Sequence, residues 1–217
     1  MSIKYVLFDL DGTLTDPGEG ITNSVAYSLK KYGIDVPDRT VLYPFIGPPL
    51  YESYEVFYGF SHEQAEEAVE FYREYYRDKG IFENLVYDGI PETLSALRDK
   101  GYKLVLATSK PEQFALRILR HFDLDGYFTV IAGADMEGNR VKKSDVIAHA
   151  LALCGASPEE CIMVGDREHD VNGAAEFGIP CIGVLFGYGS REELESSGAR
   201  RIAETPSQIT DIILREI

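Results

Sequence analysis

The sequence predicts an α/β fold in which a doubly wound, mostly parallel sheet carries an inserted all-helical domain. One short run of Val, Ile and Leu type lies near the start of the chain, and similar runs alternate with helical patterns from about residue 82 onward. Such runs are typical of strands that are buried on both faces of a parallel sheet. The stretch between has only helical periodicity, which separates it from the sheet.

Five apolar runs are the predicted strands. They are Ile3 to Phe8, Leu104 to Ala107, Thr129 to Ala132, Ile162 to Val164 and Ile182 to Leu185. Helical patterns separate or follow the later runs, and their starts are marked by Pro91, Pro111, Ser144 and the capping-box sequence Thr205 to Gln208. Strands and helices that alternate at this spacing predict parallel crossover connections.

The inserted helical domain is predicted over residues 16–81, which leaves residues 1–15 and 82–217 for the sheet domain. One helical stripe in the insertion consists of Ile21, Val25, Leu29 and Tyr32. A second helix is predicted to start at the capping box Ser61 to Gln64. Apolar residues follow this box at helical spacing, namely Ala65, Ala68, Val69, Tyr72 and Tyr76.

The charge balance argues against several classes of partner. The chain has 217 residues, with 36 Asp and Glu against 21 Lys and Arg, and a formal net charge of −15. Binding to nucleic acid or to an anionic membrane surface needs clustered cations, and the sequence contains no such cluster. Charged residues also interrupt each apolar run well before the about 18 residues that a membrane-spanning helix needs. We therefore expect a soluble, cytoplasmic protein with neither nucleic acid nor a membrane as its partner.

Acidic side chains follow two of the predicted strands. Asp9 and Asp11 come directly after the first strand, and Asp166 and Asp170 come after the fourth. Ligands of open α/β sheets bind at the carboxyl ends of the strands, so we expect these side chains to share a site. Close carboxylates are costly unless a cation joins them, and oxygen ligands favour Mg²⁺. Taken separately, Asp9 and Asp11 also suit a turn, and Asp170 also suits a helix cap.

A hydroxyl-rich segment follows the second predicted strand. Thr108 and Ser109 offer hydroxyl and backbone N–H groups just before a helix, and such groups hold phosphate in many proteins. The same two residues could instead cap that helix. Lys142 and Lys143 precede another helix, where a cation could reach a bound anion, although lysines in a loop are usually solvated.

Together, these motifs resemble those of the haloacid dehalogenase superfamily, specifically its phosphatases with a helical cap inserted after the first motif. The set comprises Asp-x-Asp at 9–11, Thr-Ser at 108–109, a lysine, and Gly-Asp-x-x-x-Asp at 165–170. The likeness covers essentially the whole chain and implies a Rossmann-like sheet domain. Phe45 to Leu50, Gly165 to Asp170 and Phe186 to Ser190 look like the branch of phosphoglycolate phosphatases, which includes proteins described as 5′-nucleotidases.

The resemblance implies the reaction centre. Asp9 would be the nucleophile that forms an aspartyl-phosphate, and Asp11 would be the general acid and base. Mg²⁺ would be the cofactor, bound by the carboxylates of Asp9 and Asp166 and by the backbone carbonyl of Asp11. Asp170 would support the metal directly or through water.

The resemblance also implies how the phosphoryl group is held. Thr108 and the N–H of Ser109 would bind a phosphoryl oxygen. Lys143 would balance the charge that develops on the phosphoryl oxygens. Lys143 fits the spacing of the family to the following helix better than Lys142 does.

The implied function is hydrolysis of a small phosphate ester, either phosphoglycolate-like or a nucleoside 5′-monophosphate, by a monomer or a homodimer. Asp11 favours phosphoryl chemistry over dehalogenation, because halide release needs no acid to protonate an alcohol. A phosphomutase of the β-phosphoglucomutase type is an alternative, but the segment from Phe45 to Leu50 lacks the arginine typical of that type. A catalytically silent binding protein on the same fold is the other alternative.

Substrate selection is expected to depend on the inserted domain, because the sheet residues contact only the transferred phosphoryl group. Tyr43, Phe45 and Ile46 are the candidate substrate contacts. The alternative for these three residues is packing within the core of the inserted domain, where aromatic side chains are usually buried.

Overall fold

The computed structural model describes residues 3–136 and 139–216 and divides the chain into two compact units. The chain passes between the units at Thr15 to Asp16 and again at Leu85 to Val86. At these crossings it forms the short strands β2 (Thr15–Asp16) and β3 (Leu85–Val86), which make a two-stranded sheet. The inserted unit therefore ends at Leu85, compared with residue 81 in the expectation from sequence.

The larger unit is built on a six-stranded sheet with the order β5-β4-β1-β6-β7-β8, in which all neighbouring strands are parallel. Its strands are β1 (Tyr5–Phe8), β4 (Lys103–Pro111), β5 (Phe128–Ala134), β6 (Cys161–Gly165), β7 (Cys181–Val184) and β8 (Arg201–Ala203). The first five lie on the predicted apolar runs, which confirms the α/β class and the parallel sheet. The sequence does not predict β8, because this edge strand has three residues and only Ala203 is buried.

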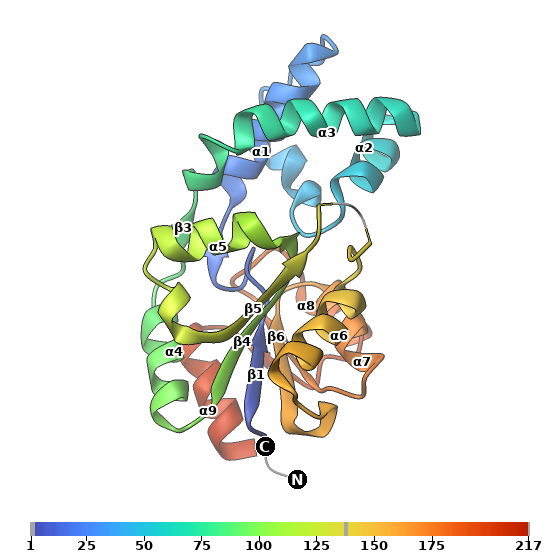
Figure 1. Ribbon diagram of the computed structural model, residues 1–217. Coiled ribbons are helices and arrows are strands. Elements are labelled where there is room, and N and C mark those ends of the chain that lie inside the picture. Colours follow the sequence, from blue (N-terminus) through green and yellow to red (C-terminus); the bar gives the residue numbers. More distant parts are fainter. Residues whose placement is uncertain (1–2, 137–138, 217) are drawn as a thin grey trace. The chain divides into compact units, whose positions relative to one another are not determined.

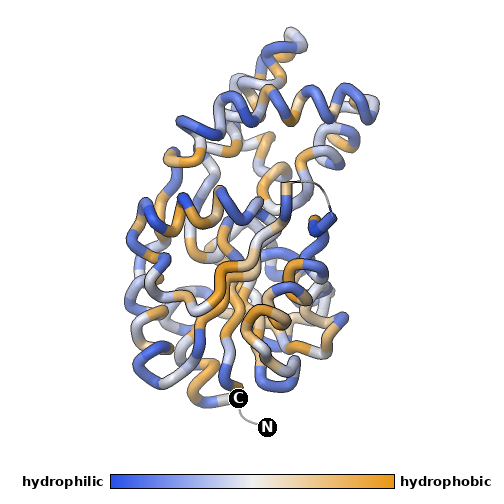
Figure 2. Tube along the Cα trace, viewed as in Figure 1, coloured by the Kyte–Doolittle hydropathy of each residue, from blue (hydrophilic) through white to orange (hydrophobic). Residues whose placement is uncertain are grey.

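Helices cover both faces of this sheet (Figure 1). Helices α6 (Lys143–Cys154) and α7 (Glu168–Ala175) share an apolar core with alternate positions of the central strands, among them Tyr5 and Leu7 of β1. On the other face, α4 (Ile90–Asp99) packs against α9 (Pro206–Glu216). The unit also contains α5 (Glu112–His121), α8 (Arg191–Ser196) and the 3₁₀ segments η3 (Asp125–Tyr127) and η4 (Pro158–Glu160). Figure 2 shows apolar residues gathered along the central strands.

The smaller unit is helical apart from its crossing strands. It contains α1 (Gly18–Lys31), η1 (Arg39–Phe45), α2 (Leu50–Tyr58), α3 (His62–Tyr76) and η2 (Gly80–Phe82). The predicted capping box begins α3, since Gln64 N–H donates to Ser61 Oγ at 3.3 Å and Ser61 N–H donates to Gln64 Oε1 at 3.0 Å. The predicted apolar positions of α3 are buried, and this helix packs against α1. In the described part of either unit, no helix has the length and apolar character needed to cross a bilayer.

Candidate active site

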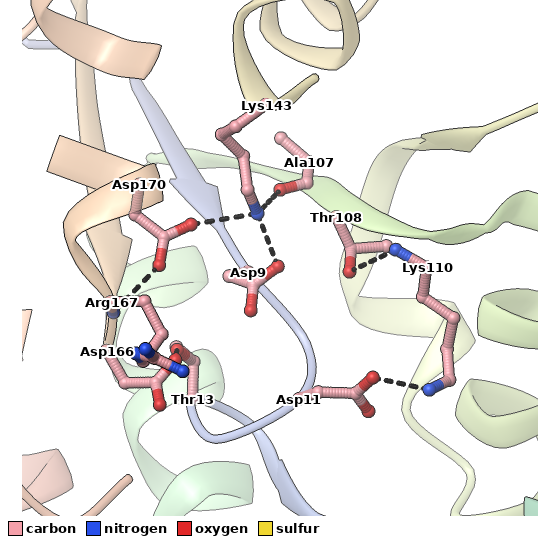
Figure 3. A network of polar contacts seen from close by, with 10 residues as sticks. All are labelled: Asp9, Asp11, Thr13, Ala107, Thr108, Lys110, Lys143, Asp166, Arg167 and Asp170. Carbon is pink, nitrogen blue, oxygen red and sulfur yellow. Dashed lines mark hydrogen bonds and ion pairs between the residues drawn. The ribbon is translucent and has the colours of Figure 1, made fainter. Parts of the chain in front are cut away.

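Three neighbouring strands of the sheet bring polar side chains to the same edge. Asp9 directly follows β1, and Asp166 directly follows β6. Thr108 lies near the carboxyl end of β4, on the other side of β1. Because parallel strands end at a common edge, these side chains lie in one network of polar contacts (Figure 3).

Lys143, the first residue of α6, joins two of the predicted carboxylates. Its Nζ lies 2.6 Å from Oδ1 of Asp9 and 2.8 Å from Oδ1 of Asp170, and it donates to the carbonyl oxygen of Ala107 at 3.1 Å. Burial alone would lower the pKa of Lys143, but the charges of Asp170 and Asp9 outweigh burial and raise that pKa. Lys143 is therefore a buried, permanent cation, whereas Lys142 is exposed.

The carboxylates of Asp9, Asp166 and Asp170 form a buried cluster. One oxygen of each carboxylate lies within 4.8 Å of the others. Burial, together with the charges of Asp170 and Asp9, raises the pKa of Asp166 well above its ordinary value. Three carboxylates that share the ammonium of Lys143 keep an excess of negative charge, so the cluster fits a further cation. Because the donors are all oxygen atoms, Mg²⁺ suits the cluster better than a soft metal ion does.

Asp11 lies two residues beyond Asp9 and contacts Lys110 of β4. Nζ of Lys110 is paired with Oδ2 of Asp11, and both side chains are buried. Burial raises the pKa of Asp11, although the charge of Lys110 opposes this shift. The sequence does not predict this pairing, since Lys110 enters the motif only as the residue after Thr108 and Ser109.

Backbone groups of the loop after β7 also reach the carboxylates. Tyr188 N–H donates to Oδ2 of Asp166 at 2.8 Å. A Cβ atom on Gly187 would lie 2.2 Å from the carbonyl oxygen of Gly12, and one on Gly12 would lie 2.2 Å from Oδ2 of Asp166. Both positions therefore require glycine. Sequence reasoning uses Phe186 to Ser190 only as a family likeness and misses this contact, although the paired glycines of that segment were an available signal.

Residues 6–184 match the family described as haloacid dehalogenase-like hydrolase. The chain belongs to this family. The matched range includes all the motif residues at the sheet edge and confirms the resemblance found in the sequence.

The relatives of this hydrolase include phosphatases. A 5′-nucleotidase from Pseudomonas aeruginosa is 51% identical over 197 residues, which cover 90% of this chain and 89% of that protein. A crystal structure of a predicted phosphatase from Clostridium acetobutylicum has a TM-score of 0.96 and 48% identity, with 99% of each chain covered. The tyrosine-protein kinase PtkA of Mycobacterium tuberculosis is 45% identical over 196 residues, which cover 90% of this chain and 67% of that protein. The family and the first two relatives show that this hydrolase is a phosphatase.

The predicted substrate contacts of this hydrolase lie in its helical unit. Tyr43 and Phe45 belong to η1, and Ile46 follows it. Tyr43 is 44% exposed, whereas Phe45 and Ile46 are 2% and 1% exposed. The ring of Phe45 packs against those of Tyr54 and Phe57, with centroids 5.1 Å and 5.4 Å away. Phe45 thus contributes to an aromatic core within this unit.

Proposed function

We propose that this phosphatase is an Mg²⁺-dependent phosphomonoester hydrolase that passes the phosphoryl group of a small metabolite to Asp9 and then to water. One observation carries the proposal. Asp9 stands at the end of β1 with Lys143 Nζ 2.6 Å from its Oδ1 and the carboxylates of Asp166 and Asp170 beside it. A carboxylate held in this way is oriented, and the groups around it balance the charge that phosphoryl transfer develops.

Asp9 is the nucleophile in this proposal. Its free oxygen attacks phosphorus in line, the bond between phosphorus and the ester oxygen breaks, and an aspartyl-phosphate forms. Water then attacks the same phosphorus and releases Asp9 with inorganic phosphate. Two displacements replace one difficult hydrolysis, which is the usual advantage of a covalent intermediate.

Asp11 is the general acid and base. It belongs to the same turn as Asp9, so both carboxylates can reach the reacting phosphate. Asp11 protonates the ester oxygen in the first displacement, and in the second it accepts a proton from the attacking water.

The acidic residues would also hold the metal. Asp9, Asp166 and Asp170 supply carboxylates, and Asp11 supplies its backbone carbonyl. When bound, Mg²⁺ neutralises carboxylate charge and permits a phosphate dianion to approach Asp9. The buried position of the three carboxylates supports this assignment, because their mutual repulsion is only partly offset by Lys143.

Thr108, Ser109 and Lys143 would bind the phosphoryl oxygens. Thr108 is 1% exposed and lies at the same sheet edge as Asp9. Hydrogen bonds from Thr108 Oγ1 and Ser109 N–H, with the nearby charge of Lys143, would stabilise the equatorial oxygens of the transition state.

The helical unit is the proposed cap that selects the leaving group, with Tyr43, Phe45 and Ile46 as candidate contacts. The relative named 5′-nucleotidase favours a nucleoside 5′-monophosphate over a phosphoglycolate-like substrate. Transfer to an acceptor other than water is the second candidate function, because another relative is named a tyrosine-protein kinase. Hydrolysis releases inorganic phosphate, whereas transfer leaves the phosphoryl group on the acceptor.

The test is phosphate release from nucleoside 5′-monophosphates, phosphoglycolate, sugar phosphates and pyrophosphate, each with Mg²⁺ or EDTA. Asp9→Asn serves as the blank. One preferred ester, with turnover that needs Mg²⁺ and is absent from the blank, is the expected result. Turnover that survives in EDTA or in the blank contradicts the mechanism. Loss of substrate without phosphate release would instead identify a transferase.

A further inference from the structure

An irregularity in β4 determines where Lys110 points. Thr108 pairs with Gly133 of β5, and Pro111 pairs with the next residue, Ala134, so Ser109 and Lys110 form a bulge between these pairs. The bulge is stabilised locally, because Thr108 Oγ1 accepts the backbone N–H of Lys110 at 3.2 Å. A bulge changes the direction of the side chains that it carries.

The redirected side chain reaches the turn after the neighbouring strand. Strand β4 pairs with β1, and Nζ of Lys110 is paired with Oδ2 of Asp11 (Figure 3). The side chains of Lys110 and Asp11 are only 6% and 12% exposed. Such a buried charge pair resists exchange with water, so the contact restricts rotation of the carboxylate.

The two oxygens of Asp11 therefore have different environments. Oδ2 is occupied by Lys110. Oδ1 is buried and has no hydrogen-bond partner among residues 3–136 and 139–216. A buried oxygen without a partner carries a desolvation cost, which a proton or a reacting group at that position would remove.

We propose that Lys110 is a positioning residue, which holds Oδ2 of Asp11 so that Oδ1 is the oxygen that exchanges protons with the substrate. This inference rests on the proposed role of Asp11 as general acid and base. In the first displacement, the proton on Oδ1 moves to the ester oxygen as its bond to phosphorus breaks and the bond from Asp9 to phosphorus forms. In the second, Oδ1 takes a proton from water as the oxygen of that water bonds to phosphorus and Asp9 leaves.

The test compares two esters of similar size that differ in leaving group. Benzyl phosphate releases an alkoxide that needs protonation, whereas 4-nitrophenyl phosphate releases a stable phenolate. Because misplaced general acids lose much of their effect, Lys110→Met should lower kcat for benzyl phosphate about 10- to 100-fold and kcat for 4-nitrophenyl phosphate less than about threefold. KM should stay within about twofold for both esters, because binding is unchanged.

Three further variants make the comparison specific. Asp11→Asn should show the same selective loss, and adding Lys110→Met to it should cost nothing more, because Lys110 acts through Asp11. Lys110→Arg keeps the charge and donors and should recover part of the loss. Lys4→Met removes an exposed ion pair with Glu160 elsewhere on the same unit and should leave both rates unchanged.

Each other outcome overturns the inference in a recognisable way. A selective loss in Asp11→Asn but an equal loss on both esters in Lys110→Met would leave the proposed function standing and reject the role of Lys110. A large rise in KM for both esters would show that Lys110 contacts substrate instead. An equal loss in Asp11→Asn would reject the acid and base role itself, and the inference with it. If Lys110→Met fails to fold, Lys110→Gln, which keeps a donor, is measured by the same criteria.

Discussion

Nζ of Lys143 lies 2.6 Å from Oδ1 of Asp9, although 134 positions separate the two residues in the chain. Asp9 ends the central strand β1, and Lys143 begins α6. The same ammonium lies 2.8 Å from Asp170 on α7, so one cation joins three elements of the sheet domain. This arrangement makes the stability of the domain depend on the chemistry of its site.

We expect Lys143→Met to destabilise the metal-free protein. Removing one member of a buried ion pair leaves the other charge unpaired, and such losses cost about 3–5 kcal/mol of unfolding free energy. Urea denaturation in EDTA measures the change. The matched control is Lys142→Met, at the exposed neighbouring lysine, which should change little. A similar small change in both variants would contradict the structural role of the Lys143 ammonium.

We expect Asp166→Asn to stabilise the metal-free protein while removing its response to Mg²⁺. Burial and the charges of Asp170 and Asp9 raise the pKa of Asp166, so its ionised form destabilises the fold. Stability in EDTA should therefore fall as pH rises above about 4, the ordinary pKa of Asp, and this fall should be smaller in the variant. Mg²⁺ should raise the Tm of the wild-type protein only. Thermal scans across pH, with and without Mg²⁺, test both effects.

Asp9→Asn should abolish both turnover and covalent labelling. An amide neither attacks phosphorus nor binds a metal ion as a carboxylate does. Intact-protein mass spectrometry after acid quenching should detect one added phosphoryl group in the wild-type protein, removable by hydroxylamine, and none in the variant. Asp145→Asn, at an exposed position in the first turn of α6, should label normally. Labelling that persists in Asp9→Asn would place the nucleophile elsewhere.

Gly187→Ala should weaken Mg²⁺ binding. A Cβ at this position would lie 2.2 Å from the carbonyl oxygen of Gly12 and 2.5 Å from Oδ2 of Asp166, so the carboxylate must move. We expect metal affinity by titration calorimetry to fall about tenfold and the unfolding free energy to fall by about 1–3 kcal/mol, as in other overpacked sites. Gly126→Ala is the control, because a methyl group at that position would meet nothing within 4 Å among the described residues. Equal affinities in the two variants would contradict the prediction.

Phe45→Ala should destabilise the helical unit. The side chain is 2% exposed and packs among aromatic rings, so truncation should cost about 3–5 kcal/mol. Tyr43→Ala, at a position that is 44% exposed, should change stability by less than about 0.5 kcal/mol. Denaturation curves separate the two, and KM values for the preferred ester test substrate contact independently. A Phe45→Ala variant with native stability and a raised KM would favour substrate contact over packing.

Much of this fold can be read from local patterns. Buried parallel strands need apolar residues on both faces, which is why five of the six strands of the main sheet appear as short apolar runs. The capping box at Ser61 and the apolar stripe of α3 depend only on residues three or four apart. Strand β8 escapes this reasoning, because an edge strand of three residues needs pairing with β7 rather than a pattern of its own.

The sequence by itself determined the α/β class, the helical insertion and the acidic residues at the strand ends, because each of these follows from residue type and short spacing. Only the tertiary structure decided that Lys110 pairs with Asp11, that Lys143 and not Lys142 is buried against Asp9, and that Tyr188 N–H reaches Asp166. These contacts join residues far apart in the chain. Their geometry depends on strand order, on the bulge in β4 and on the close approach of Gly187 to Gly12, and none of these is encoded in a local pattern.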